Sequence, residues 1–132
     1  MKPSPFIKSE LYLGEVLCGL FGIAEDYDEK ELDLHQLLVK NPSSTFFMKA
    51  KGESMSPTIS SNDLLIVDCS RTPLTNDIVV AEYLGKRICK RFIQKNHQIM
   101  LQSDNQKFSP IILSSDCDFS IFGTVSGIIR RL

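Results

Sequence analysis

The chain has 132 residues, of which 42% are hydrophobic and 23% are charged, a balance typical of one globular domain. Fifteen basic residues against sixteen acidic ones give a net charge of −1, without the basic excess that a phosphate-binding surface needs. We therefore expect no direct, sequence-specific binding of DNA.

The apolar runs, such as residues 64–67, are much shorter than the roughly 20 residues that cross a bilayer. The first ten residues carry Pro3 and Pro5 but no apolar stretch that ends in small residues, so we expect no secretory signal. The four cysteines and two histidines lie at no metal-ligand spacing. These features predict a cytoplasmic protein with reduced thiols and without a metal, a cofactor or a membrane partner.

Residues 1 to about 31 show no sustained helix or strand period, and we interpret them as an extended arm. Asp33 is placed to cap a short helix with leucines at i, i+3 and i+4, and Asn41-Pro42 closes it, because proline disfavours helix at the preceding residue. The predicted organisation is an arm with one short helix over residues 1–43 and a β-domain over residues 44–132.

Beyond the helix, apolar residues recur with period two between short polar turns. Gly85 marks a hairpin, and a polar turn is expected over residues 103–106. This pattern predicts a mostly β, compact and mostly antiparallel fold. The strands are expected at residues 46–51, 64–67, 78–83, 87–94, 99–101, 111–113 and 119–130.

Lys90 lies on an unusual face of its predicted strand. Because successive side chains alternate, it shares that face with Ile88 and Phe92. Burial disfavours the charged ammonium, so a buried lysine can serve as a neutral general base. Alternatively, the stem of Lys90 packs on the sheet while its charged end reaches water. The strand pattern alone leaves both interpretations open.

Ser54 lies where a predicted strand ends at Gly52 and the chain turns at Pro57. A serine hydroxyl is a poor nucleophile until a base takes its proton, and a neutral lysine can do this. A turn can also aim backbone N–H groups at one point, as an oxyanion hole requires. Serine is equally a common turn residue, so Ser54 is informative mainly together with Lys90.

Several segments together resemble the LexA-like serine autopeptidases, and in particular their UmuD-like SOS-mutagenesis branch, over nearly the whole chain from about Val16. The segments are Gly52-Glu53-Ser54-Met55, residues 62–68, Asn76-Asp77-Ile78-Val79 and Ile88-Cys89-Lys90-Arg91. Lys90 follows Ser54 at the spacing of the family's Ser/Lys dyad. The resemblance therefore implies a LexA-like peptidase fold with Ser54 as nucleophile and Lys90 as its base.

The resemblance also gives a role to Cys18-Gly19, which would otherwise be a cysteine beside a flexible glycine. Members of this branch cut their own arm at a Cys-Gly bond, which implies self-cleavage between Cys18 and Gly19. We assign the oxyanion to the backbone N–H groups of Glu53 and Ser54. The chain lacks the prolines that relatives often carry after Gly19, and its segment after Met55 is one residue shorter. These departures leave the conformation of the arm and of the loop open.

The same resemblance implies partners: a second copy in a homodimer, a RecA nucleoprotein filament on single-stranded DNA that stimulates cleavage, and a Y-family, UmuC-like translesion polymerase that the shortened dimer serves. A repressor would need a DNA-binding helical module upstream, and the residues before Ser54 show no suitable pattern. A signal peptidase shares the serine and lysine but needs a membrane anchor. The remaining alternative is a polymerase accessory protein that does not cleave itself and keeps a vestigial dyad.

Overall fold

The chain divides into two compact units, Met1–Leu37 and Leu38–Leu132. In the first unit, strands β1 (Tyr12–Gly14) and β2 (Tyr27–Glu31) pair in antiparallel fashion, a short ladder that the aperiodic sequence does not indicate. The computed structural model describes residues 12–14, 16, 18, 27–31 and 33–132.

The short helix α1 (Leu34–Leu38) begins directly after Asp33, as the sequence predicts. The Asp33 carboxylate accepts hydrogen bonds from the backbone N–H groups of His35 at 3.0 Å and Gln36 at 3.3 Å. These bonds satisfy two of the N–H groups that a helix start leaves unpaired. A 3₁₀ turn (Pro42–Ser44) follows, so the proline lies after the helix and not inside it.

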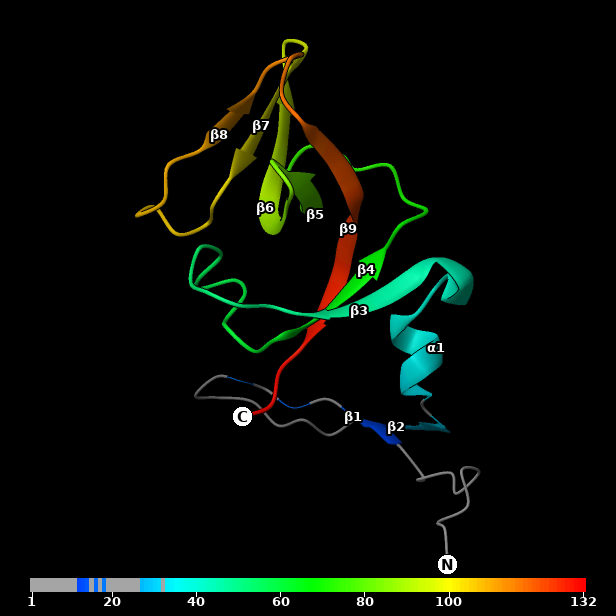
Figure 1. Cartoon of the computed structure of the whole chain (residues 1–132). Coiled ribbons are helices and arrows are strands. Elements are labelled where there is room, and N and C mark those ends of the chain that lie inside the picture. Colours follow the sequence, from blue (N-terminus) through cyan, green and yellow to red (C-terminus); the bar gives the residue numbers. More distant parts are fainter. Residues whose placement is uncertain (1–11, 15, 17, 19–26, 32) are drawn as a thin grey trace, which may run out of the picture. The chain divides into compact units, whose positions relative to one another are not determined.

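The second unit contains one antiparallel sheet of seven strands in the order β3-β4-β9-β5-β6-β7-β8. This sheet confirms the predicted compact, mostly antiparallel β-fold. Figure 1 shows the long strand β9 with β4 and β5 as its neighbours. The strands are β3 (Thr45–Lys49), β4 (Leu64–Asp68), β5 (Ile78–Tyr83), β6 (Lys86–Lys95), β7 (Gln98–Gln102), β8 (Ile111–Leu113) and β9 (Phe119–Ile129).

Two tight hairpins fix the register of β5, β6 and β7. Their turns are Leu84-Gly85, with φ of 50° and 78°, and Asn96-His97, with φ of 53° and 64°. Positive φ at both central residues is what a type I′ turn requires, and its twist matches that of the flanking strands. The second turn places Arg91 of β6 opposite Gln102 of β7.

The core consists of two clusters of buried side chains on the two faces of the sheet. Val79 and Val80 are neighbours in β5 but belong to different clusters, because their side chains point to opposite faces. The first cluster includes Met55 and Ile59, which come from the loop between β3 and β4. Packing of the core therefore also holds this loop in place. Among the described residues, no helix has the length and apolar character needed to cross a bilayer.

Candidate active site

Ser54 lies on the loop between β3 and β4. Backbone hydrogen bonds join the two ends of this loop. The N–H of Ala50 donates to the carbonyl of Asp63 at 2.8 Å, and the N–H of Asn62 donates to the carbonyl of Ala50 at 2.7 Å. Within the loop, the side chain of Met55 is only 3% exposed. The segment that carries Ser54 is therefore held both at its ends and in its middle.

The Asp63 side chain holds the same loop. Its buried carboxylate accepts hydrogen bonds from Nε and Nη2 of Arg130, at 2.7 and 2.6 Å, and from the N–H of Ser60 at 2.8 Å. The bonds from Arg130 first, and then that from Ser60, lower the pKa of Asp63 to about 2, against the opposing effect of burial. Arg130 also donates to the carbonyl of Thr58 at 3.3 Å.

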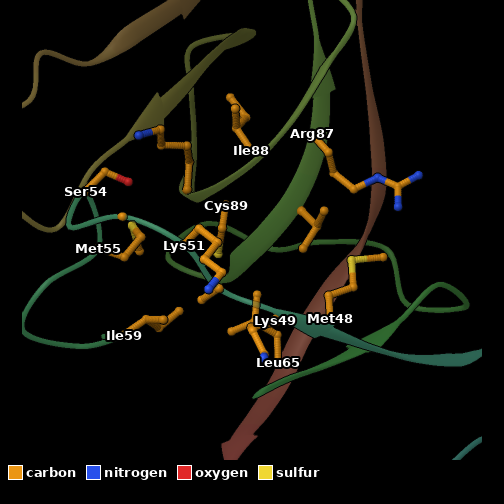
Figure 2. Close-up of a pocket in the computed structure, with 14 residues that line it drawn as sticks. Met48, Lys49, Lys51, Ser54, Met55, Ile59, Leu65, Arg87, Ile88 and Cys89 are labelled. Carbon is orange, nitrogen blue, oxygen red and sulfur yellow. The ribbon is translucent and has the colours of Figure 1, made fainter. Parts of the chain in front are cut away.

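Ser54 and Lys90 line one pocket of about 560 Å³ formed by β3, the loop after it and β6. Met55 and Leu65 of the first core cluster contribute apolar lining. Figure 2 shows Ser54 at one end of this pocket and Arg87 towards the other. The structure thus brings the predicted nucleophile and the predicted base to one cavity, although they lie far apart in the sequence.

The Lys90 side chain is half-buried, and its Nζ donates a hydrogen bond to the hydroxyl of Ser103 at 2.8 Å. The same nitrogen lies 5.6 Å from the centre of the Phe108 ring. Burial lowers the pKa of Lys90, and the neighbouring Cys89 opposes this in part. Burial therefore makes the neutral amine, the form that can accept a proton, more accessible than it is for an ordinary lysine.

Ser54 is half-buried, and its backbone is held by Asn105. The N–H of Asn105 donates to the carbonyl of Ser54 at 3.0 Å, and its side-chain amide donates to the carbonyl of Glu53 at 3.0 Å. In the part of the chain that the structure describes, the N–H groups of Glu53 and Ser54 have no hydrogen-bond acceptor. The side chain of Glu53 is exposed, and Glu53 does not line the pocket.

Residues 103–106 contribute to the site, although their sequence indicates only a polar turn. Ser103 is 4% exposed and contacts Lys90, whereas Asn105 holds Ser54. Between them, Asp104 accepts hydrogen bonds from the guanidinium of Arg91 and from the hydroxyl of Thr58. A two-residue turn at Asn96-His97 is the signal that could have indicated this arrangement, because it pairs Arg91 with Gln102 and so brings the next residues, Lys90 and Ser103, near each other.

The two residues of the predicted cleavage site belong to the first unit. Cys18 is exposed, and Gly19 lies outside the described residues. Within those described residues, no group of three or more His, Cys, Asp or Glu side chains is placed to hold a metal ion.

Comparison with known proteins identifies the family. The family model described as Peptidase S24-like matches residues 10–126. The chain is 35% identical over 123 residues to protein ImpA of Salmonella typhimurium. The aligned region covers 92% of this chain and 83% of ImpA. It is 36% identical over 109 residues to protein SamA of Salmonella typhimurium, and this alignment covers 82% of this chain and 75% of SamA. It is also 38% identical over 122 residues to LexA repressor 2 of Geobacter sulfurreducens, and this alignment covers 91% of this chain and 59% of that repressor. The chain therefore belongs to the Peptidase S24-like family, as a UmuD-like relative of the LexA repressors.

Proposed function

We propose that this chain is a serine autopeptidase that cuts its own arm between Cys18 and Gly19, with Ser54 as nucleophile and Lys90 as general base. The observation that carries the proposal is that Ser54 and the half-buried Lys90 line the same pocket. The lowered pKa of Lys90 and the membership in a peptidase family support it.

In the proposed reaction, neutral Lys90 takes the proton of the Ser54 hydroxyl while Oγ attacks the carbonyl carbon of Cys18. The N–H groups of Ser54 and Glu53 hold the resulting oxyanion. The intermediate collapses as the C–N bond breaks, and protonated Lys90 gives its proton to the Gly19 amine. An ester remains between Ser54 and Cys18. Water then attacks this ester, with Lys90 accepting its proton, and Ser54 is regenerated.

We also propose a biological setting, which rests on the UmuD-like resemblance. The protein acts in the SOS response in the cytoplasm as a homodimer. A RecA nucleoprotein filament stimulates cleavage by binding the state with the docked arm better than the undocked state. The shortened dimer then serves as accessory subunit of an error-prone Y-family, UmuC-like polymerase in translesion synthesis.

The competing function is a polymerase accessory protein that never cleaves itself. The observation in its favour is that Lys90 donates its hydrogen bond to Ser103, and that no hydrogen bond joins Lys90 and Ser54 among the described residues. This geometry does not exclude a dyad, because catalytic hydrogen bonds are often long in structures without substrate and tighten only when substrate binds.

The two functions are separated by mass spectrometry of the purified protein at mildly alkaline pH, with and without RecA filaments on single-stranded DNA. We expect the wild type to lose residues 1–18, and Ser54→Ala and Lys90→Ala to remain intact. Ser109→Ala and Lys95→Ala, both at exposed positions, are matched controls and should be cut normally. An intact wild type under every condition would favour the accessory function. A cut that survives Ser54→Ala would mean that another residue is the nucleophile.

A further inference from the structure

We propose that Ser103 is the positioning residue that holds the amine of Lys90 in place for proton transfer from Ser54. This inference rests on the proposed function and adds a residue outside the Ser/Lys dyad. Its starting point is the 2.8 Å hydrogen bond from Lys90 Nζ to Ser103 Oγ. Ser103 is only 4% exposed, so the acceptor of this bond is buried.

The backbone places Ser103 where it can do this. Arg91 and Gln102 are the last pair of the β6–β7 ladder, and Ser103 follows directly where β7 ends. Lys90 and Ser103 are thus the next residues beyond this pair on the two chains. The register of the ladder therefore brings Ser103 close enough for the Lys90 amine to reach its hydroxyl.

The segment after Ser103 is fixed to both parts of the site. Asp104 binds the guanidinium of Arg91, next to Lys90 in β6. The N–H of Asn105 binds the carbonyl of Ser54 at 3.0 Å. A hydroxyl mounted on this segment therefore has a defined position relative to both the nucleophile and the base.

A hydroxyl is chemically suited to the task. A lysine side chain is long and flexible, and ordering it costs conformational entropy. A neutral amine has two N–H donors and one lone pair, so Ser103 can accept one N–H and leave the lone pair free for the proton of Ser54. An uncharged acceptor also avoids the strong stabilisation of the ammonium that a carboxylate would give, which is consistent with the lowered pKa of Lys90.

The test compares initial rates of self-cleavage across the pH range for the wild type, Ser103→Ala and Ser109→Ala. Ser109 lies in the same loop but is exposed, which makes Ser109→Ala the matched control. We expect Ser103→Ala to cleave about ten-fold more slowly on the alkaline plateau, where Lys90 is neutral in both proteins, and Ser109→Ala to match the wild type.

The direction of the change in cleavage rate shows whether Ser103 positions the amine of Lys90 or only adjusts its pKa. Loss of an acceptor for the ammonium pushes the pKa of Lys90 further down, which alone would raise the neutral fraction and speed cleavage near neutral pH. A Ser103→Ala variant that cleaves as fast as the wild type, or faster, on the alkaline plateau would therefore overturn the proposal.

A second pair of variants distinguishes loss of the hydroxyl from a general loss of folding. Threonine and valine are similar in size, but only threonine carries a hydroxyl. We expect Ser103→Thr to cleave about ten-fold faster than Ser103→Val at a temperature where both variants are fully folded. Equal cleavage rates would overturn the proposal. If the wild type itself stays intact, the proposed function fails, which is a different outcome from equal cleavage by all variants.

Discussion

The side-chain amide of Asn105 donates a 3.0 Å hydrogen bond to the carbonyl of Glu53. That carbonyl belongs to the peptide group whose N–H is that of Ser54, and in a planar trans peptide the two point in opposite directions. By holding the carbonyl on one side, Asn105 directs the N–H of Ser54 to the other. Asn105 therefore aligns one of the two donors proposed to hold the oxyanion.

We expect Asn105→Asp to slow self-cleavage on the order of ten-fold, because a carboxylate cannot donate to the Glu53 carbonyl and repels it. The measurement is the initial rate at which the shortened chain forms at fixed alkaline pH. Gln106→Glu is the matched control, since it makes the same charge change at the neighbouring exposed position. Equal rates for the two variants would contradict a role for Asn105 in aligning the oxyanion donors.

Much of the sheet could be predicted from the sequence, because period-two patterns and turn residues are local properties. Strands β5 and β8 have the predicted bounds, and the Leu84-Gly85 turn lies where Gly85 indicated a hairpin. The β1–β2 ladder could not be predicted in this way, since its residues carry no such period. Pairing of short strands without a periodic pattern depends on contacts that a local reading of the sequence does not contain.

The candidate site was predicted only in part for a similar reason. Lys90 stands out because it shares a strand face with apolar residues, and Ser54 stands out only because Lys90 follows it at the spacing of the family's dyad. Ser103 and Asn105 do not, because serine and asparagine are ordinary turn residues. Their importance comes from the register of β6 and β7 and from contacts with a loop about fifty residues earlier, as in the Asn105 bond to Glu53. Such contacts are tertiary and require the fold.

Self-cleavage should accelerate as pH rises. Lys90 acts as a base only when neutral, and burial lowers its pKa, so the rate should rise through that lowered pKa and level off below the pH at which an ordinary lysine titrates. The measurement is the initial cleavage rate in a series of buffers of constant ionic strength. A rate that does not change with pH would contradict Lys90 as the base.

The neighbouring thiol provides the control for this pH profile. Burial raises the pKa of Cys89 to about 11, so the thiol remains protonated while Lys90 titrates. Because Cys89 also raises the pKa of Lys90 in part, Cys89→Ala should keep the alkaline rise in rate and move its midpoint to lower pH. Loss of the alkaline rise in this variant would assign the titration to the thiol and not to Lys90.

Asp63 should make the protein sensitive to acid. Its hydrogen bonds from Arg130 lower its pKa to about 2. A carboxyl group with a lowered folded-state pKa stabilises the fold above its unfolded pKa of about 3.9, and this contribution is lost as pH falls towards the folded value. Asp63→Asn should therefore unfold at lower urea concentration than the wild type at neutral pH, and the difference should shrink as the pH approaches 2.

The control for this experiment is Asp116→Asn, which removes one carboxylate at an exposed position. Asp116→Asn should leave the urea midpoint at neutral pH within error of the wild type. A constant difference between Asp63→Asn and the wild type from neutral pH down to the acid limit would show that the hydrogen-bonded carboxylate is not the source of the acid sensitivity.

Gly123 of β9 lies where two strands approach closely. A Cβ at this position would lie 2.7 Å from Cγ1 of Val67 and 3.1 Å from the carbonyl oxygen of Asp68, whereas a Cβ at Gly127 would be 3.5 Å from Ile66, an ordinary contact. Gly123→Ala should therefore lower the free energy of unfolding by about 1–3 kcal/mol in urea titrations. The control Gly127→Ala should change it by less than about 1 kcal/mol.

The same substitution should also slow self-cleavage, because of where β9 lies in the sheet. The strand order places β9 between β4 and β5, so β9 joins the part of the sheet that carries Ser54 to the part that carries Lys90. A side chain that forces β9 away from β4 changes the separation of the two dyad residues, and proton transfer is sensitive to shifts of about 1 Å. We expect Gly123→Ala to cleave more slowly than Gly127→Ala at a temperature where both are fully folded. Equal rates would mean that the pocket holds Ser54 and Lys90 together independently of the packing of β9 on β4.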